Sequence, residues 1–253
     1  VLCTSGTTGD PREVELTHAN LIANLEGSLR RVDLGPRDVL GHILPPHHSF
    51  GLTVGKMLPL LAAATGIYTN RYREVADLIR DRHITIFIAI PALFTTLARK
   101  LEDGLDRKKR DSAILRFLDR HLPRTVGRKI RHKQGWTGLR FFLSGAAPMP
   151  RWVLDTLWRR GFRMYEGYGT TENSPVYGFN ERLEKLGSVG KPIDTLSVKI
   201  VDENNQTLGP HQKGEICLGG PCIMKGYYRN PQATEAAIHT DAEGVRWLHT
   251  GDL

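Results

Sequence analysis

The stretch Ile84-Thr85-Ile86-Phe87-Ile88-Ala89-Ile90, followed directly by Pro91, decides the fold class of this chain. The run is almost continuously β-branched or aromatic, which is typical of a parallel strand buried on both faces. Proline is favoured in the first turn of a helix. The apolar residues that recur after it at helical spacing are Leu93, Phe94, Leu97 and Leu101. The sequence therefore predicts a buried strand that leads directly into a helix.

Strands and helices alternate on both sides of this stretch. We expect strands at residues 14–16, 139–143 and 162–165, and helices around residues 21–29, 75–79 and 152–160. Thr17 is a suitable N-cap for the first of these helices. The alternation predicts an α/β fold with a parallel sheet flanked by helices.

The character of the chain changes after about residue 174. Short strand-like runs at residues 197–201 and 214–218 are separated by turn-forming residues at 202–205 and 219–221. We therefore expect two parts. Residues 1–174 form the α/β part, and residues 175–253 form a small β-rich, barrel-like subdomain.

The composition indicates a globular protein with an excess of positive charge. The 253 residues carry a formal net charge of +8, which suits a polyanionic ligand, an anionic membrane surface or nucleic acid. Cys3, Cys217 and Cys222 match neither a disulfide framework nor a paired zinc spacing, so we expect a reduced, cytoplasmic protein. The most apolar stretch, residues 57–68, is shorter than the roughly 20 residues that span a bilayer.

Much of the positive charge gathers in residues 106–133. Apolar residues interleave with it, namely Ile114, Leu115, Phe117, Leu118 and Leu122. We interpret the segment as a surface helix with a core-facing apolar stripe. The alternative is a helix that lies peripherally on the inner face of a membrane and gathers anionic lipid. We expect no nucleic-acid partner, because no stacking platform or recognition motif accompanies the charge.

Near the start, Thr4-Ser5-Gly6-Thr7-Thr8-Gly9-Asp10-Pro11-Arg12 combines hydroxyls and glycines with a terminal cation. Glycines let the backbone approach an anion closely, and N–H groups with hydroxyls donate to phosphate oxygens. The run lacks the Gly-Lys-Ser/Thr ending of a Walker loop, and a strand follows it where that motif requires a helix. The pattern alone leaves a flexible linker as an alternative to a phosphate loop.

Two further loops follow predicted parallel strands, at residues 144–148 and 167–172. Ligands of open α/β sheets bind outside the carboxyl ends of the strands. The second loop offers Tyr168 to stack a base, Thr170 and Thr171 to hold a phosphate, and Glu172 to coordinate magnesium through oxygen. Asp252, in the last loop, is a candidate partner for ribose hydroxyls. Together these loops predict a nucleotide site.

The order of the motifs makes the resemblance specific. They are Thr4-Ser5-Gly6-Thr7-Thr8-Gly9-Asp10-Pro11, Leu16-Thr17-His18-Ala19-Asn20, Leu44-Pro45-Pro46-His47-His48-Ser49-Phe50-Gly51, Ser144-Gly145-Ala146-Ala147-Pro148, Gly167-Tyr168-Gly169-Thr170-Thr171-Glu172, Gly214-Glu215-Ile216, Lys225-Gly226-Tyr227-Tyr228 and Thr250-Gly251-Asp252-Leu253. Over its whole length the chain resembles the adenylate-forming, AMP-binding superfamily of acyl-CoA synthetases, peptide-synthetase adenylation domains and luciferases. It looks most like the long-chain fatty acyl-CoA synthetases.

The resemblance implies a role for each loop. Residues 4–9 would hold the ATP β- and γ-phosphates, Thr171 would contact the α-phosphate, Glu172 would bind Mg²⁺ and Asp252 would hold the ribose. The residues that would complete the nucleotide pocket are Gly145, Ala146, Ala147, Tyr168, Gly169 and Thr170.

The resemblance also implies where the acid binds. His48 and Gly167 would adjoin the acyl pocket, whereas His47 is expected to be a structural surface residue. The family's phosphate loop usually ends in Pro-Lys-Gly, and here Arg12 and Glu13 follow Pro11. Arg12 keeps the positive charge and is able to grip phosphate, so we count it with Thr171 and Glu172 as catalytic.

The implied reaction has two halves. ATP and a carboxylic acid, a fatty acid by the resemblance, give an acyl-adenylate, and coenzyme A then takes the acyl group as a thioester. Transfer to the phosphopantetheine of a carrier protein is the first alternative, and nucleotide binding without turnover is the second. Both ends of the sequence look cut, and the family's adenylation lysine belongs to a C-terminal domain that would lie beyond Leu253. We therefore expect the isolated chain to be inactive.

Overall fold

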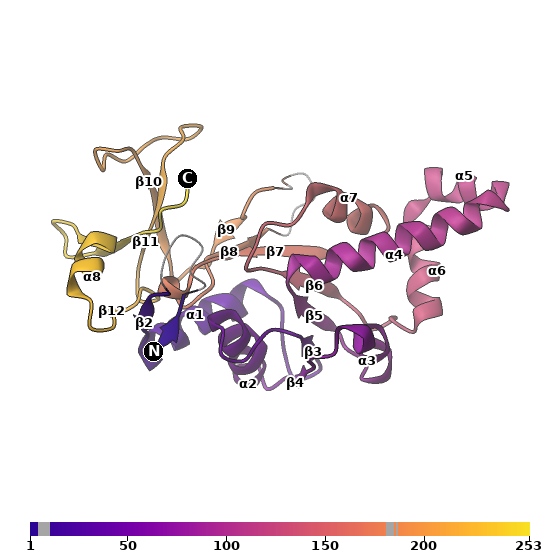
Figure 1. The fold of residues 1–253 in the computed structure, drawn as a ribbon, viewed down its shortest axis with the longest axis horizontal. Coiled ribbons are helices and arrows are strands. Elements are labelled where there is room, and N and C mark those ends of the chain that lie inside the picture. Colours follow the sequence, from indigo (N-terminus) through magenta and orange to yellow (C-terminus); the bar gives the residue numbers. More distant parts are fainter. Residues whose placement is uncertain (5–10, 181–184, 186) are drawn as a thin grey trace.

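The structure is a computed structural model, and it describes residues 1–4, 11–180, 185 and 187–253 (Figure 1). The helices are α1 His18–Arg31, α2 Leu58–Leu61, α3 Val75–Asp81, α4 Pro91–Arg110, α5 Ala113–His121, α6 Pro123–Gln134, α7 Arg151–Arg159 and α8 Pro231–Ala237. Shorter helical turns span Gly51–Met57, Tyr72–Glu74 and Thr171–Asn173. The strands are β1 Leu2–Cys3, β2 Glu13–Glu15, β3 Val39–His42, β4 Thr65–Tyr68, β5 Ile86–Ala89, β6 Phe141–Ser144, β7 Met164–Tyr168, β8 Gly178–Asn180, β9 Lys191–Pro192, β10 Ser197–Val201, β11 Glu215–Gly219, β12 Gly226–Tyr227, β13 Ile238–Thr240 and β14 Arg246–His249.

A seven-stranded sheet, in the order β4-β3-β5-β6-β7-β8-β9, forms the body of the molecule. The five strands from β4 to β7 run parallel, and β8 and β9 are antiparallel additions at one edge. The predicted buried strand is β5, which pairs in parallel with β3 on one side and with β6 on the other. The α/β prediction is therefore confirmed, with a mixed sheet in place of a purely parallel one.

Both faces of this sheet are covered, as the continuous apolar run predicts. Ile86 and Ile88 pack into a cluster that includes Leu25 of α1. Phe87 belongs to a second cluster, which includes Phe94 of α4. Successive residues of a strand point to opposite faces, so one apolar run supplies two cores.

Local signals place the helices correctly. The Thr17 hydroxyl accepts a hydrogen bond from the Asn20 amide at 3.1 Å and caps α1. Pro91 stands in the first turn of α4, where its missing N–H costs no helical hydrogen bond.

The second part of the chain is β-rich. A four-stranded antiparallel sheet has the order β10-β11-β14-β13. A three-stranded sheet, β1-β2-β12, joins the start of the chain to the β-rich part, because Val14 is paired with both Leu2 and Tyr227. The division at residue 174 remains a prediction; β8 and β9, which follow that residue, extend the large sheet.

The basic segment forms the end of α4 and all of α5 and α6, which together project from one end of the molecule (Figure 1). The prediction of a core-facing apolar stripe is wrong for three of its members. Ile114, Phe117 and Leu122 are 74%, 59% and 51% exposed, because the helices stand away from the sheet and leave their outer face uncovered. Among the described residues, no helix is long and apolar enough to cross a membrane.

Candidate active site

A cleft of about 1170 Å³ opens at the carboxyl ends of β6 and β7, beside the β1-β2-β12 sheet and the loop after β14. The predicted site residues that line it are Thr4, Arg12, His48, Gly145, Ala146, Gly167, Tyr168, Gly169, Thr170, Thr171, Glu172 and Asp252. Ala147 does not line the cleft. Ser5, Gly6, Thr7, Thr8 and Gly9 lie outside the described residues.

Thr4 and Arg12 hold the two ends of the predicted phosphate loop together. The Thr4 amide donates to the Arg12 carbonyl oxygen at 2.9 Å, and the Arg12 amide donates to the Thr4 hydroxyl at 3.0 Å. Glu13, which stands where the family usually has glycine, is paired with Cys3 in a regular antiparallel ladder. This position is a strand residue here, so it needs none of glycine's conformational freedom.

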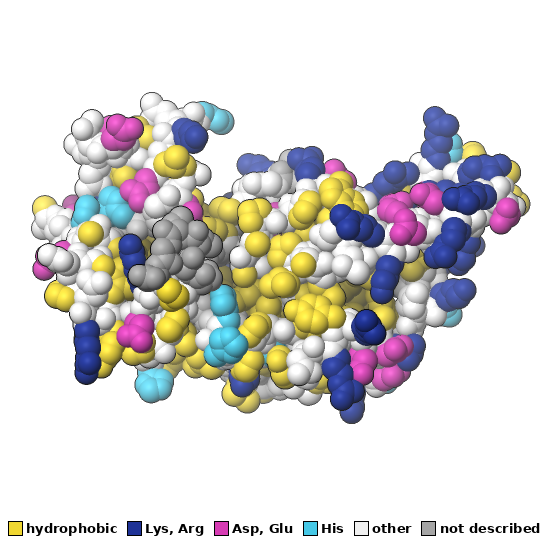
Figure 2. Space-filling model, in the orientation of Figure 1, with side chains coloured by type: hydrophobic (Ala, Val, Ile, Leu, Met, Phe, Trp, Pro, Cys, Tyr) yellow, Lys and Arg dark blue, Asp and Glu magenta, His cyan; other side chains and the backbone are white. Residues whose placement is uncertain are grey.

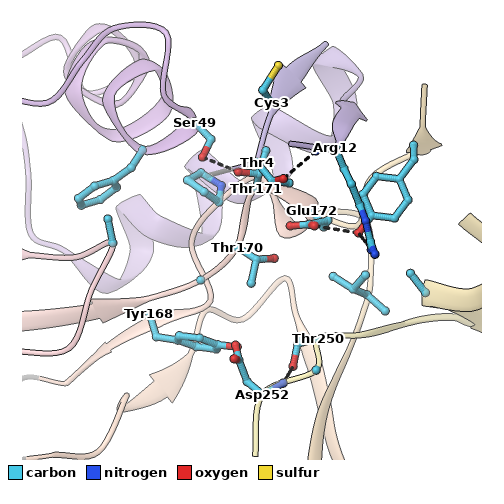
Figure 3. A pocket seen from close by; sticks show the side chains of 18 of the residues that line it. Cys3, Thr4, Arg12, Ser49, Tyr168, Thr170, Thr171, Glu172, Thr250 and Asp252 are labelled. Carbon is cyan, nitrogen blue, oxygen red and sulfur yellow. Dashed lines mark hydrogen bonds between the residues drawn. The ribbon is translucent and has the colours of Figure 1, made fainter. Parts of the chain in front are cut away.

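Glu172 and Arg12 meet through a residue that the sequence analysis did not single out, Tyr227 of β12. Its hydroxyl donates to Glu172 Oε1 at 2.9 Å, and the Arg12 guanidinium lies 5.2 Å from the centre of its ring. Burial, followed by the nearby Glu172 carboxylate, raises the pKa of Tyr227, so the phenol stays a hydrogen-bond donor at neutral pH. Figure 3 shows the Glu172 and Arg12 side chains close to Thr4 and Thr171.

The hydroxyl of Thr171 is held from the opposite side. Thr171 Oγ1 and Ser49 Oγ share a hydrogen bond of 3.1 Å in a buried position. Ser49 belongs to the predicted His47-His48-Ser49 motif, but no residue pattern predicts that it reaches the 167–172 loop. The contact links two motifs that are 122 residues apart.

Tyr168 and Asp252 form a second polar pair across the cleft from Glu172 (Figure 3). The Tyr168 hydroxyl donates to Asp252 Oδ2, and the Asp252 amide donates to the Thr250 hydroxyl at 3.1 Å. Burial and the Asp252 carboxylate raise the pKa of Tyr168 well above its usual value. Tyr168 is therefore neutral at physiological pH and orients the carboxylate predicted to meet the ribose.

Asn24 of α1 holds the backbone that directly follows the 167–172 loop by hydrogen bonds. This fully buried side chain donates from Nδ2 to the carbonyl oxygens of Asn173 at 2.9 Å and Val176 at 2.8 Å. Its Oδ1 accepts from the Val176 amide at 3.2 Å. Asn24 was not among the predicted site residues; the available signal was an amide among the apolar positions of a predicted helix.

Gly169 is required by a close approach of two backbone segments. It adopts φ +157, and a Cβ at this position would lie 1.7 Å from the carbonyl oxygen of Pro175. The loop therefore packs directly on the segment that follows it, which brings Thr170 and Thr171 to the cleft wall.

A scan against protein-family models matches the AMP-binding enzyme family over residues 1–228. The chain belongs to that family. It is 35% identical to the peroxisomal long chain acyl-CoA synthetase 6 of Arabidopsis thaliana and 32% identical to the human long-chain-fatty-acid–CoA ligase 6. These matches cover 99% and 100% of the chain, but only 38% and 39% of the two relatives.

The solved structures agree with this assignment. ATP-bound MatB from Rhodopseudomonas palustris superposes with a TM-score of 0.78 at 26% identity, over 99% of this chain and 44% of that one. The family prediction and the predicted fold class are therefore confirmed. The chain of this AMP-binding enzyme spans about two fifths of the length of the curated relatives that it matches.

In this AMP-binding enzyme His48 is a neutral hydrogen-bond acceptor. Its Nδ1 accepts from the Phe50 amide at 3.2 Å, so the other ring nitrogen, Nε2, carries the proton. Burial, with a smaller contribution from His47, lowers the pKa of His48 below its usual value. His47 itself is exposed, in agreement with the surface position expected for it.

Gly145 and Phe50 close the cleft beside His48. A Cβ on Gly145 would lie 3.0 Å from the Phe50 ring, so the ring would have to shift by a few tenths of an ångström to accept even alanine there. Ala146 adopts φ +69, a left-handed conformation that costs energy for a residue with a Cβ. Backbone strain of this kind clusters at ligand sites, which agrees with the placement of Ala146 on the cleft wall.

Proposed function

We propose that the protein containing this chain activates a fatty acid with ATP and transfers the acyl group to coenzyme A. The observation that carries the proposal is the cleft itself. The cleft is lined by the Thr171 hydroxyl, the Glu172 carboxylate and the Arg12 guanidinium. The hydrogen-bonded pair Tyr168 and Asp252 also lines it. Arg12 and Thr171 would suit the phosphates of ATP, Glu172 would suit a metal ion, and Asp252 would suit the ribose. The long chain acyl-CoA synthetases among the relatives support the choice of fatty acid as substrate.

In the first half of the reaction a carboxylate oxygen attacks the α-phosphorus of ATP. An O–P bond forms, the bond from phosphorus to the bridging β-oxygen breaks, and pyrophosphate leaves with that electron pair. Both reactants are anions, so catalysis depends on neutralising charge and on positioning. Arg12 supplies positive charge from the loop side of the cleft, and the Thr171 hydroxyl donates to an α-phosphate oxygen while the Ser49 hydroxyl donates to Thr171 Oγ1.

The donor set fits Mg²⁺, which prefers oxygen ligands. Tyr227 donates to Glu172 Oε1, and no donor in the described part of the chain reaches Oε2. Glu172 would hold the ion with Thr171 beside it, and a bound Mg²⁺ would neutralise phosphate charge. Tyr227 fixes the orientation of the carboxylate without removing its charge.

In the second half the coenzyme A thiolate attacks the acyl carbonyl carbon. A C–S bond forms, the C–O bond of the mixed anhydride breaks, and AMP leaves. Cys3, Cys217 and Cys222 are free thiols, and Cys217 and Cys222 are buried. Burial raises the pKa of Cys217 to about 11, so its thiol stays protonated and takes no part in the transfer. Free thiols also support a reducing, cytoplasmic location for the reaction.

The test uses the full-length protein with ATP, Mg²⁺ and fatty acids of graded length. Coenzyme A and a phosphopantetheine carrier protein are offered in separate reactions, and pyrophosphate and the thioester are measured. We expect acid-dependent pyrophosphate release and acyl-CoA. Glu172→Gln should lower both at least about 100-fold, and Glu203→Gln, at an exposed glutamate outside the cleft, is the control. ATP binding without acid-dependent pyrophosphate would refute the activity, and thioester on the carrier protein alone would refute coenzyme A as acceptor. The same assay on residues 1–253 tests whether this part is inactive alone.

A further inference from the structure

The excess charge of the chain is confined to one place. Residues 106–133 contain 11 Lys and Arg residues and three Asp residues, so this segment has a formal net charge of +8. The whole chain has the same formal net charge, +8. The rest of the sequence is therefore balanced. Figure 2 shows the dark blue side chains gathered over the projecting end formed by α4, α5 and α6.

The few acidic residues of this segment do little to offset the charge at its surface. Asp119 is buried and pairs with Lys109 at 2.6 Å and with Arg160 at 3.2 Å. Asp106 is 3.2 Å from the same Lys109. Asp111 is exposed, and the remaining cations, Arg120 among them, are exposed too, except for Arg131, which is half-buried.

Large apolar side chains are exposed among these cations. Ile114 and Phe117 lie one turn apart on α5 and are 74% and 59% exposed, and Leu122, at its end, is 51% exposed. The Phe117 ring contacts His121, with ring centres 4.6 Å apart. On the inner face of α5 Asp119 is buried, and Leu115 and Leu118 are half-buried. Since the helix already has a packed face, the exposed residues are a second apolar face.

We propose that α5 docks on the surface of a lipid bilayer that contains anionic lipid. An amphipathic helix binds such a surface when apolar side chains enter the boundary between headgroups and acyl chains while Lys and Arg meet anionic headgroups. The apolar side chains that would enter this boundary are Ile114, Phe117 and Leu122. The cations that would meet the headgroups are Arg116, Arg120 and those of α6. Neither the insertion of apolar side chains nor the attraction of cations to headgroups gives firm attachment alone, and α5 presents both kinds of side chain together.

The position of α5 in the fold is compatible with this role. α5 lies at the opposite end of the molecule from β10, β11 and α8 (Figure 1), and the C-terminal loop lines the cleft. Docking through α5 therefore leaves the cleft accessible. Nucleic acid fits less well, because it would leave Ile114 and Phe117 in water, whereas a bilayer buries them.

The experiment measures sedimentation of the full-length protein with vesicles of phosphatidylcholine, with and without phosphatidylglycerol, at low and high salt. We expect at least about tenfold stronger binding to the anionic vesicles, reduced by salt. The double variant Ile114→Ser, Phe117→Ser should lower binding about tenfold, and Arg120→Glu should lower it selectively on anionic vesicles. The matched controls are Leu60→Ser, at an apolar residue 78% exposed on α2, and Lys213→Glu, at an exposed lysine.

A second measurement reports contact between α5 and the acyl chains directly. Phe117→Trp should show quenching by brominated acyl chains in anionic vesicles only. Unquenched Trp fluorescence, or equal losses in the α5 variants and the controls, would overturn the proposal. Binding to an RNA duplex through Arg120 without vesicle binding would also overturn it. Because no step requires turnover, this proposal stands or fails independently of the ligase activity, and circular dichroism with ATP binding checks that each variant is folded.

Discussion

The strongest test of the site's construction is the variant Asn24→Ala. Asn24 is fully buried on α1 and makes three hydrogen bonds to the backbone of the loop that carries Thr171 and Glu172. Its removal leaves the carbonyl groups of Asn173 and Val176 and the Val176 amide without their partner. The change therefore acts on the positions of Thr171 and Glu172 without touching either side chain.

The magnitude follows from these three groups. A buried polar group that loses its partner costs about 1–3 kcal/mol, so three groups at the low end cost about 3 kcal/mol. This is a large share of a typical margin of about 5–15 kcal/mol, and it corresponds to a fall in Tm of about 6–12 °C for a domain of this size. We expect ATP binding to weaken as well, because the Asn24 contacts fix the loop that lines the cleft.

The assay is urea unfolding of the full-length protein together with calorimetric titration of ATP. Glu26→Ala, an exposed position of the same helix, is the control for a change in helix propensity. Asn24→Asp serves as the conservative variant, since it keeps the acceptor for the Val176 amide and loses the donor to the two carbonyl groups. A loss below about 1 kcal/mol in Asn24→Ala, with an unchanged Kd for ATP, would refute the reasoning, because it would show that water or a loop shift replaces all three bonds.

Three further outcomes test other parts of the structure. Glu172→Gln should lower kcat for pyrophosphate formation at least about 100-fold with little change in KM for the acid, since the proposed metal ligand would act on developing charge; a raised KM alone would contradict this. Asp252→Ala should weaken ATP binding about tenfold and leave kcat at saturating ATP nearly unchanged, because a ribose contact is made equally in ground and transition states; an unaltered Kd would remove Asp252 from the site. Burial alone would raise the pKa of Asp38, but hydrogen bonds from Arg140 and Thr85 lower it below its usual value. Asp38 therefore contributes stability above about pH 4 that is lost as the pH falls through its folded-state pKa, so Asp38→Asn should unfold more easily at pH 7 and show a smaller loss between pH 5 and pH 3 in urea titrations.

Several features follow from local sequence because their causes lie within a few residues. The continuous apolar run at residues 84–90 requires burial on both faces, and β5 is buried on both faces. The capping role of Thr17 depends on Asn20 three residues later. The strand-end loops at 144–148 and 167–172 meet because the carboxyl ends of parallel strands lie at one edge of a sheet.

Other features were missed because they depend on how α5 and the edge of the sheet pack. The alternation of apolar and basic residues in α5 has the same appearance whether the outer residues face a core or solvent. Only the projection of α4 to α6 away from the sheet leaves Ile114 and Phe117 exposed. β8 and β9 are two or three residues long, and their antiparallel pairing at the sheet edge has no periodic signal to predict it.

The sequence by itself determined the parallel strands of the sheet, their flanking helices and most of the groups that line the cleft. It did so because hydrophobic periodicity and strand-end placement are local properties of the chain. Only the tertiary structure decided which partners hold those groups. Tyr227 reaches Glu172, and Asn24 reaches Val176, across 55 and 152 residues. A hydrogen bond requires its two atoms to lie within about 3 Å, and this distance is set by the packing of α1 and β12 around the 167–172 loop, which no spacing of residues in the sequence encodes.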